Sequence, residues 1–349
     1  MTAVPGTGPD APVASHFGDP FGEQRAMERL AAVVDRSHRG VLQVSGPDRL
    51  SWLHSITSQH LSALRDGDST QALVLSPHGH VEQHWQVTEL ADAGGGTVWL
   101  DVEPGTEGVV LGYLQSMRFM LRVEPVDVTA DWAVLTLVGP TTPDVLAAAG
   151  LPVPEADGRA LPRPGGGFVR RRAADEVDLV VARAELESVR AALVAAGARA
   201  AGTWAYEARR VAHRVPRLGF ETDHRTIPHE VGWIGRAVHL DKGCYRGQET
   251  VARVFNLGRP PRRLVLLMLS GESDELPPPG TPVELDGRAV GFLGTAVQHH
   301  EDGPIALAVV KRSVPDDATL GVAGTSATID PAPADDLALP AHAGRTYAR

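Results

Sequence analysis

The sequence predicts an α+β protein with two similar α+β units and a small all-β domain at the C-terminal end. Three observations lead to this prediction. A strand–Gly-Pro–helix pattern occurs twice, around Gly46-Pro47 and around Gly139-Pro140. Alternating or apolar runs typical of strands lie between helical patterns throughout the first two hundred or so residues. From Arg263 onward only strand-like runs and loops follow, which favours a terminal β domain, most simply a small barrel.

The first unit opens with the apolar run 41–45, which reads as a buried strand. Gly46-Pro47-Asp48 then begins a helix, because proline in the first helical turn loses no hydrogen bond. Apolar residues from Leu50 onward continue this helix at helical spacing. Three strands and a further helix are expected next, at 71–75, 81–89, 97–101 and 106–120.

The second unit repeats the pattern 93 residues later, with a strand at 133–138, Gly139-Pro140 and a helix at 143–149. This spacing hints at a duplicated unit, although two Gly-Pro pairs alone do not establish one. A Pro/Gly-rich connector at 151–167 precedes further strands and helices, expected at 168–172, 177–182, 184–196 and 203–213.

The β domain contains a predicted hairpin whose turn is Asp286-Gly287, a pair that accepts the positive φ angles of a tight turn. The expected organisation is therefore a disordered lead-in, two α+β units, the β domain and a disordered tail. Their boundaries are 1–18, 19–135, 136–260, 261–330 and 331–349.

Composition narrows the classes of function. The net charge of -10 argues against broad nucleic-acid binding, and direct tRNA binding is not expected. The segment 202–263 nevertheless holds twelve basic and six acidic residues, a balance of +6 that suggests an anion site or solvated arginines on several faces. The chain has one cysteine, no long apolar run and no basic, apolar leader, so a cytoplasmic protein without a membrane span is expected.

The decapeptide 241–250, DKGCYRGQET, holds the only cysteine, Cys244, and Lys242, one of two lysines in the chain. A single cysteine is more often a small buried hydrophobe. Here cationic neighbours would favour the thiolate, which is the reactive form of cysteine. We therefore interpret Cys244 and Lys242 as a catalytic or otherwise functional pair, with the lysine count too small to exclude chance.

Glu230 and Trp233 form a second candidate site. A carboxylate can accept two parallel hydrogen bonds from a flat, amidine-like edge such as that of a pterin. Trp233 could help to wall such a pocket. The alternative is that Glu230 pairs with a nearby arginine, such as Arg225 or Arg236, and this alternative is favoured on the residues alone.

The runs RLGFETDHRTIPHEVGW and HLDKGCYRGQETVARVFNLGRPPRRLV resemble the YgfZ family of folate-binding proteins. That family is related to the glycine-cleavage aminomethyltransferase (GcvT, or T-protein). Its motif K-G-C-Y-x-G-Q-E is complete here, and the resemblance covers roughly residues 20–330. It implies a GcvT-like three-domain ring, with two ferredoxin-like α+β units and a small barrel around a tetrahydrofolate pocket.

The resemblance also implies a role in iron–sulfur cluster assembly or repair, which would support tRNA modification indirectly. Partners would be folate, iron–sulfur assembly proteins and iron–sulfur client enzymes. Glu230 would hold the pterin and Cys244 would be the functional cysteine. The rest of the expected cofactor-binding set is Trp233, Tyr245, Gly247, Gln248, Glu249 and Arg253; no metal ligands are expected.

One departure separates the chain from aminomethyltransferases. T-proteins carry an aspartate in a G-x-x-x-D stretch of the first unit, whereas the corresponding positions here are Gln83 and His84. We therefore expect an accessory protein rather than an aminomethyl or methyl transferase, and His84 is expected to be structural. The transferase stays the alternative, followed by a non-catalytic folate-sensing or RNA-contacting module.

Overall fold

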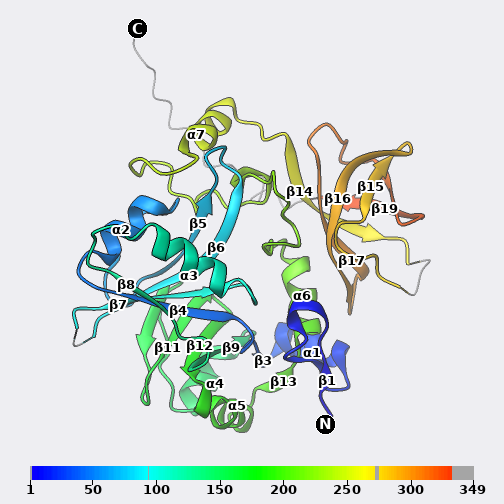
Figure 1. Ribbon diagram of the computed structural model, residues 1–349. Coiled ribbons are helices and arrows are strands. Elements are labelled where there is room, and N and C mark those ends of the chain that lie inside the picture. Colours follow the sequence, from blue (N-terminus) through cyan, green and yellow to red (C-terminus); the bar gives the residue numbers. More distant parts are fainter. Residues whose placement is uncertain (1, 93, 272–274, 332–349) are drawn as a thin grey trace.

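The computed structural model describes residues 2–92, 94–271 and 275–331 (Figure 1). Two β-sheets pack face to face, each covered on its outer side by helices, and a closed six-stranded barrel lies beside them. The predicted α+β class with a terminal barrel is confirmed. Within the described residues, no helix is long and apolar enough to cross a membrane.

The first unit is a five-stranded antiparallel sheet in the order β5-β6-β7-β4-β8. Its residues alternate between the two faces of the sheet: Val98, Leu100 and Val102 of β7 pack under the helices, whereas Trp99 faces the second sheet. The elements are β4 (Gly40–Ser45), α2 (Arg49–Ile56), β5 (Ser69–Leu75), β6 (Val81–Leu90), β7 (Thr97–Val102), α3 (Glu107–Ser116) and β8 (Glu124–Asp127).

The second unit is a six-stranded sheet in the order β10-β11-β12-β9-β3-β13, with β13 parallel to β3 and the other pairs antiparallel. Helices α4 and α5 cover its outer face. The elements are β3 (Ala32–Asp35), β9 (Trp132–Val138), α4 (Thr142–Ala148), β10 (Arg159–Pro162), β11 (Phe168–Ala173), β12 (Glu176–Ala182), α5 (Leu186–Ala195) and β13 (Arg199–Ala201).

The topology supports the duplication that the Gly-Pro pairs suggested. Both units run strand–helix–three strands–helix–strand, and corresponding strands occupy corresponding places in the two sheets. The only difference in sheet order is β3, which is inserted between β9 and β13. Gly46 and Gly139 follow the first strand of each unit, and both have positive φ angles, of 105° and 124°.

The predicted boundary between the units needs correction. The segment containing β3 and α1 (Pro20–Arg29) was assigned to the first unit, but β3 pairs with β9 and β13 of the second sheet. In addition, β9 spans the expected boundary at residue 135. Periodicity within a segment cannot show which sheet a strand joins, because that depends on contacts between distant parts of the chain.

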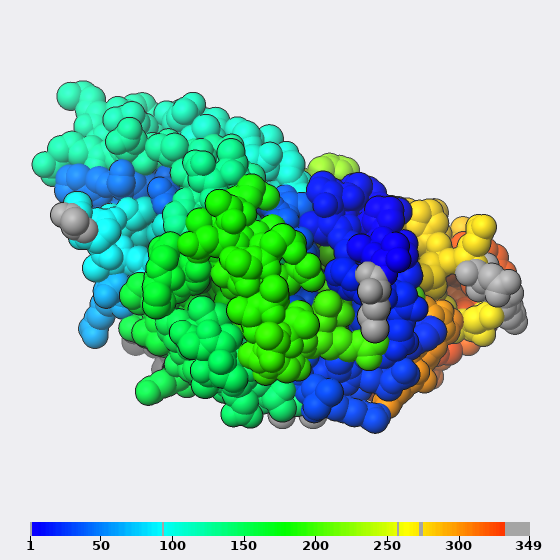
Figure 2. All heavy atoms as spheres, turned by 90° about the horizontal axis from the view of Figure 1, so that it is seen from below, coloured from blue at the N-terminus to red at the C-terminus, as the bar shows by residue number. Residues whose placement is uncertain are grey.

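The expected disordered lead-in at 1–18 is also corrected. Described residues of this segment form β1 (Val4–Pro5), the 3-10 helix η1 (Gly8–Asp10) and β2 (Ala14–His16). Asp10 accepts two hydrogen bonds from Arg217, at 2.9 and 2.7 Å. Figure 2 shows the N-terminal segment, in blue, between the second unit in green and the barrel in yellow to red. The predicted disordered tail falls almost wholly on 332–349, outside the described residues.

The segment between the second sheet and the barrel links all the parts. Helix α6 (Thr203–Ala212) packs against α1 on one side and the barrel on the other. The chain then passes through the 3-10 helix η3 (Pro228–Glu230) to α7 (Gln248–Leu257), above the β5–β6 hairpin. The barrel follows, with strands β14 (Arg262–Leu269), β15 (Pro282–Leu285), β16 (Arg288–His299), β17 (Gly303–Lys311), β18 (Thr319–Val322) and β19 (Thr325–Asp330).

Candidate functional site

A cavity of about 460 Å³ opens between the two sheets and α6. Strands β5 and β6 of the first sheet contribute glutamine side chains, and the β11–β12 turn contributes arginines and carboxylates. Its principal lining side chains are Gln71, Gln86, Arg171, Arg172, Asp175, Glu176, Tyr206, Arg209, Arg210 and Arg236. The duplicated units therefore supply opposite walls of one cavity.

A smaller cavity of about 50 Å³ adjoins the first and shares several of its lining residues, including Gln86, Tyr206 and Arg236. It is also lined by His84 and Trp233, whose rings stack with centroids 4.9 Å apart and planes inclined by 25°. Together these aromatic rings give the combined site a flat wall suited to a planar ligand.

His84 is a neutral hydrogen-bonding group in this wall. Burial lowers the pKa of His84 to about 4, so the imidazole is uncharged at neutral pH. Its Nε2 lies 2.9 Å from Oε1 of Gln71, which can only accept, so Nε2 carries the proton and Nδ1 is an acceptor. His84 was expected to be structural. Its ring also lines the smaller cavity, where it could contact a ligand.

The larger cavity is positively charged. Five arginines line it, against the two carboxylates Asp175 and Glu176. Most of these arginines are paired: Arg172 lies 3.0 Å from Glu176, and Arg209 donates to Asp175 at 2.9 Å. Arg236 differs, because its guanidinium has no hydrogen bond or ion pair to any residue that the structure describes. It is therefore free to bind an anion.

A buried charge network holds the two sheets together behind the cavity. Arg170 on β11 donates to Asp178 on β12 and to Asp101 on β7, so it bridges the two sheets. Arg39 extends the network from Asp101 to Glu103. Burial alone would raise the pKa of Asp101, but the guanidinium groups of Arg170 and Arg39 outweigh burial and hold this pKa well below its ordinary value. The carboxylate therefore stays ionised.

Glu230, the carboxylate expected to hold a pterin, pairs with an arginine in this structure. It is buried, and Nε and Nη2 of Arg262 donate to its two oxygens, both at 2.8 Å. It lines neither cavity. The alternative of an arginine partner is therefore the one observed, although that partner is Arg262 rather than Arg225 or Arg236. The expected neighbour Trp233 does lie at the site, against His84.

Lys242 does not activate Cys244 in the way that its sequence position suggested. Its buried ammonium donates to the main-chain carbonyls of His54, Thr57 and Gln59, which use all three of its N–H bonds. Burial lowers the pKa of Lys242 to about 8. The ammonium also lies 5.0 Å from the ring centroid of Tyr245. Lys242 thus anchors the motif segment to the loop after α2.

Cys244 is exposed, and none of the KGCYxGQE motif residues lines either cavity. Gln248, Glu249 and Arg253 lie on α7, the last two exposed. Gly247 precedes this helix with φ +82°, and a Cβ there would lie 2.6 Å from the carbonyl oxygen of Ser76. The motif therefore packs on the β5–β6 hairpin and presents Cys244 at the surface, outside the set of residues that line the two cavities.

Sequence reasoning missed most of the residues that do line the cavity. Arg171, Arg172, Glu176 and Tyr206 come from the β11–β12 hairpin and α6. The run Arg170-Arg171-Arg172 in an otherwise apolar strand was the available signal, since strands seldom place arginine on a buried face. Gln86 carried no comparable signal, because it lies in β6, a strand in which polar and apolar residues alternate along the sequence.

Comparison with known proteins agrees with this architecture. Residues 18–154 match the family model described as the GCVT N-terminal domain. A protein of Arabidopsis thaliana named "Putative transferase, chloroplastic" is 28% identical over 279 residues, covering 77% of this chain and 62% of the relative. This chain therefore spans less than two thirds of that relative's length.

The aminomethyltransferase of Symbiobacterium thermophilum is 26% identical over 314 residues, covering 84% of this chain and 80% of the relative. Among solved structures, the glycine cleavage system aminomethyltransferase T of Bartonella henselae superposes with a TM-score of 0.81. That comparison covers 94% of this chain and 92% of the other at 18% identity, and it confirms the predicted fold. Residues 18–154 thus match the GCVT N-terminal domain, and the chain has the fold of the solved aminomethyltransferase T and is similar in sequence to aminomethyltransferases.

Proposed function

We propose that the central cavity binds tetrahydrofolate or a close folate derivative. The cavity has a volume within the usual range of small-ligand pockets, roughly 300–1,000 Å³. Its arginines attract an anionic ligand, and the His84–Trp233 stack offers a flat wall. Folate combines a planar pteridine with a carboxylate tail, so it matches both features. The match to the GCVT N-terminal domain adds support, because proteins of that family typically bind tetrahydrofolate.

The single observation that carries this proposal is the unpaired guanidinium of Arg236 at a cavity that also holds a flat wall. We place the carboxylate tail at Arg236, where a charge-assisted hydrogen bond needs no existing ion pair to break. The pteridine then lies towards Gln86 and His84. The Gln86 amide offers both a donor and an acceptor to the polar edge of the pteridine, a role that sequence reasoning gave to Glu230.

Arg236→Ala is expected to weaken tetrahydrofolate binding by at least about tenfold, because one charge-assisted contact contributes roughly 1.5–3 kcal/mol. Anaerobic calorimetry with tetrahydrofolate measures the change directly. Arg225→Ala is the matched control, since Arg225 is an exposed arginine of the same segment that lines neither cavity. Equal affinities for both variants and the wild type would remove the proposed tail position.

At the level of the cell, we propose a YgfZ-type accessory role in iron–sulfur cluster assembly or repair, with Cys244 as the functional thiol. The complete KGCYxGQE motif supports this role. The exposure of Cys244 suits a thiol that acts on a partner protein. Clusters normally take about four protein ligands, so any cluster would be shared with a partner protein or small thiol. Because Lys242 is occupied, the reactivity of Cys244 would depend on the partner surface.

Cys244→Ser is expected to abolish the rescue of iron–sulfur enzyme activity in a strain that lacks the protein, while tetrahydrofolate affinity stays within about twofold of the wild type. The two readouts separate because the thiol lies outside the cavity. Ser270→Ala, on the surface of the barrel domain, serves as a control for expression and folding. Full rescue by Cys244→Ser would refute a role for the thiol.

The alternative is a tetrahydrofolate-dependent aminomethyl or methyl transferase. The names of the bacterial relatives favour it, and His84 borders the cavity as a neutral group that could accept a proton at Nδ1. Two observations argue against a transferase. Gln83 is an amide and not a carboxylate, and its Oε1 already accepts a hydrogen bond from the indole N–H of Trp85 at 3.0 Å. Turnover of an amine donor with tetrahydrofolate, lost in His84→Phe, would establish the transferase.

A further inference from the structure

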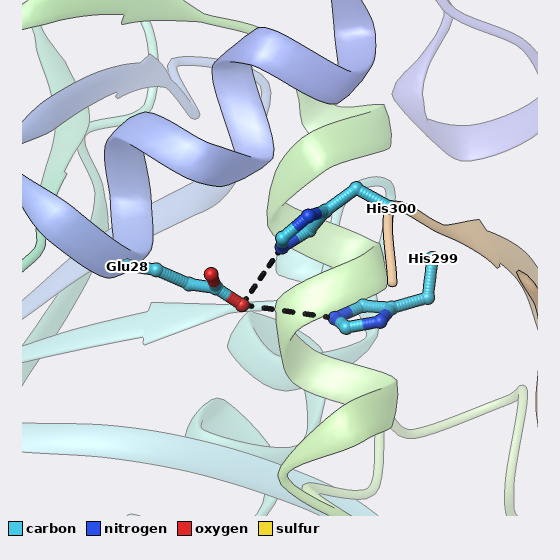
Figure 3. A group of neighbouring side chains, drawn as sticks. All are labelled: Glu28, His299 and His300. Carbon is cyan, nitrogen blue, oxygen red and sulfur yellow. Dashed lines mark ion pairs between the residues drawn. The ribbon is translucent and has the colours of Figure 1, made fainter. Parts of the chain in front are cut away.

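A cluster of three side chains that could bind a metal ion, none of which lines either cavity, lies where α1 meets the barrel (Figure 3). Glu28 comes from the last turn of α1, His299 ends β16, and His300 follows it in the turn to β17. One potential ligand atom from each residue lies within 4.8 Å of the others. Figure 3 shows both imidazoles directed from the barrel side towards the Glu28 carboxylate.

The imidazole nitrogens and the carboxylate of this cluster are not fully hydrogen-bonded. Nε2 of His300 lies 2.8 Å from Oε1 of Glu28, and Nε2 of His299 lies 4.0 Å from the same oxygen. The His300 side chain is only 2% exposed, yet its Nε2 has no hydrogen-bond partner of acceptable geometry. A buried nitrogen without a partner is costly, and here it faces a carboxylate and a second imidazole. A cation between the three groups would satisfy all of them.

The ligands are already held in place by surrounding hydrogen bonds. The side chain of Gln24 on α1 donates to the carbonyl of Gln298 and accepts from the main-chain N–H of His300, both at 2.9 Å. On the far side of its ring, Nδ1 of His299 lies 3.0 Å from Oδ2 of Asp302 and 3.2 Å from the Asp302 main-chain nitrogen. In the structure the Asp302 N–H donates to Nδ1; with a metal at Nε2, Nδ1 would instead carry the ring proton and donate it to the Asp302 carboxylate.

We propose that Glu28, His299 and His300 bind one Zn²⁺ ion that clamps α1 to the barrel. Two neutral imidazoles and one carboxylate are a donor set that suits zinc, with a water molecule completing a tetrahedron. Ca²⁺ and Mg²⁺ prefer sites made entirely of oxygen, so they are disfavoured here. Zinc–ligand bonds of about 2.0–2.2 Å need only small side-chain movements from these positions.

The clamp would join parts of the protein that the rest of the fold connects less directly. Helix α1 packs with α6 and the second sheet, whereas His299 and His300 belong to the barrel. Zinc would therefore link the position of the barrel directly to helix α1 near the N-terminus. Because the ligands lie at opposite ends of the chain, no sequence spacing announces this site.

Zinc titration of the untagged full-length protein tests the proposal. We expect the wild type to retain one zinc ion per chain after dialysis and to show a higher Tm with zinc than with a chelator, since a ligand that binds only the folded state stabilises it. Glu28→Gln and His299→Gln should each weaken zinc affinity at least tenfold by calorimetry and remove the Tm shift. Both side chains are less buried than His300, so these variants should fold.

A second histidine group provides the control. The rings of His54, His60 and His239 lie side by side near Lys242, with centroids 4.8 Å apart for His54–His60 and 5.2 Å for His60–His239, and could bind zinc adventitiously. His60→Gln should leave both the stoichiometry and the Tm shift of the wild type unchanged. The proposal is overturned if the wild type retains no zinc, if Glu28→Gln and His299→Gln bind like the wild type, or if His60→Gln is the variant that loses binding.

Discussion

Arg170→Met is expected to lower the free energy of unfolding by about 3–5 kcal/mol, because it removes the cation that two buried carboxylates share. The Arg170 side chain is 2% exposed, and its guanidinium contacts Asp101 from the first sheet and Asp178 from the second. Methionine fills much of the volume but supplies no positive charge. The two carboxylates would then face each other in the protein interior, where water cannot solvate them fully.

Urea unfolding at neutral pH, followed by circular dichroism, measures this effect. Arg171→Met is the matched control on the same strand, because the Arg171 side chain pairs with the exposed Asp157. Such a surface pair contributes about 0–1 kcal/mol. Equal losses in the two variants would show that the buried network does not hold the sheets together. Adding Asp178→Leu and Asp101→Leu to Arg170→Met should recover part of the loss, because no buried charge is then left alone.

The elements that could be predicted from sequence are those governed by local patterns. The strand at 133–138 and the helix at 203–213 appear within about a residue of their expected bounds, as β9 and α6. Apolar periodicity and glycine positions encode such elements directly. By contrast, β3 and β13 were not anticipated, because short strands carry little periodic signal and their partners lie far away in the chain.

The charged residues of the candidate site also depend on contacts between distant parts of the chain, which the sequence does not reveal. The +6 balance of segment 202–263 suggested an anion site, yet many of its arginines pair with carboxylates elsewhere. Arg217, for example, binds Asp10 and Glu103, and Arg262 binds Asp223 and Glu230. Four of the seven Arg, Asp and Glu side chains that line the larger cavity instead come from the β11–β12 hairpin. A motif can be read from sequence, but which ionic groups stay unpaired is decided by the fold.

The motif itself illustrates that a specific sequence signal does not give the place of its residues in the fold. KGCYxGQE predicted a thiol beside the ligand, whereas Lys242 and Gly247 serve to fix the segment onto the first unit. The thiol that they present is exposed. The motif thus predicts which residues act together, whereas the arrangement of the chain shows that the thiol among them is exposed.

Acidification from pH 7.5 to pH 5 is expected to destabilise the protein, with His229 a main cause. His229 is buried on η3, both its ring nitrogens lack hydrogen-bond partners, and burial lowers the pKa of His229 to about 4. The unfolded chain takes up a proton near pH 6.5, which the folded protein cannot do until about pH 4. Stability therefore falls as the pH drops through this window and levels off below it.

Urea unfolding at pH 7.5 and pH 5 tests this linkage. At most about 2 kcal/mol of the loss at pH 5 should come from His229, and less where water reaches the ring. His229→Leu should remove that share of the pH dependence, whatever its effect on stability at pH 7.5, whereas His224→Leu, at an exposed position nearby, should keep it. An unchanged pH dependence in His229→Leu would contradict the assignment. The stabilisation from carboxylates with lowered pKa values, such as Asp101 and Glu103, is lost only from about pH 5 downward, so the loss above pH 5 separates the histidine from the ion-pair network.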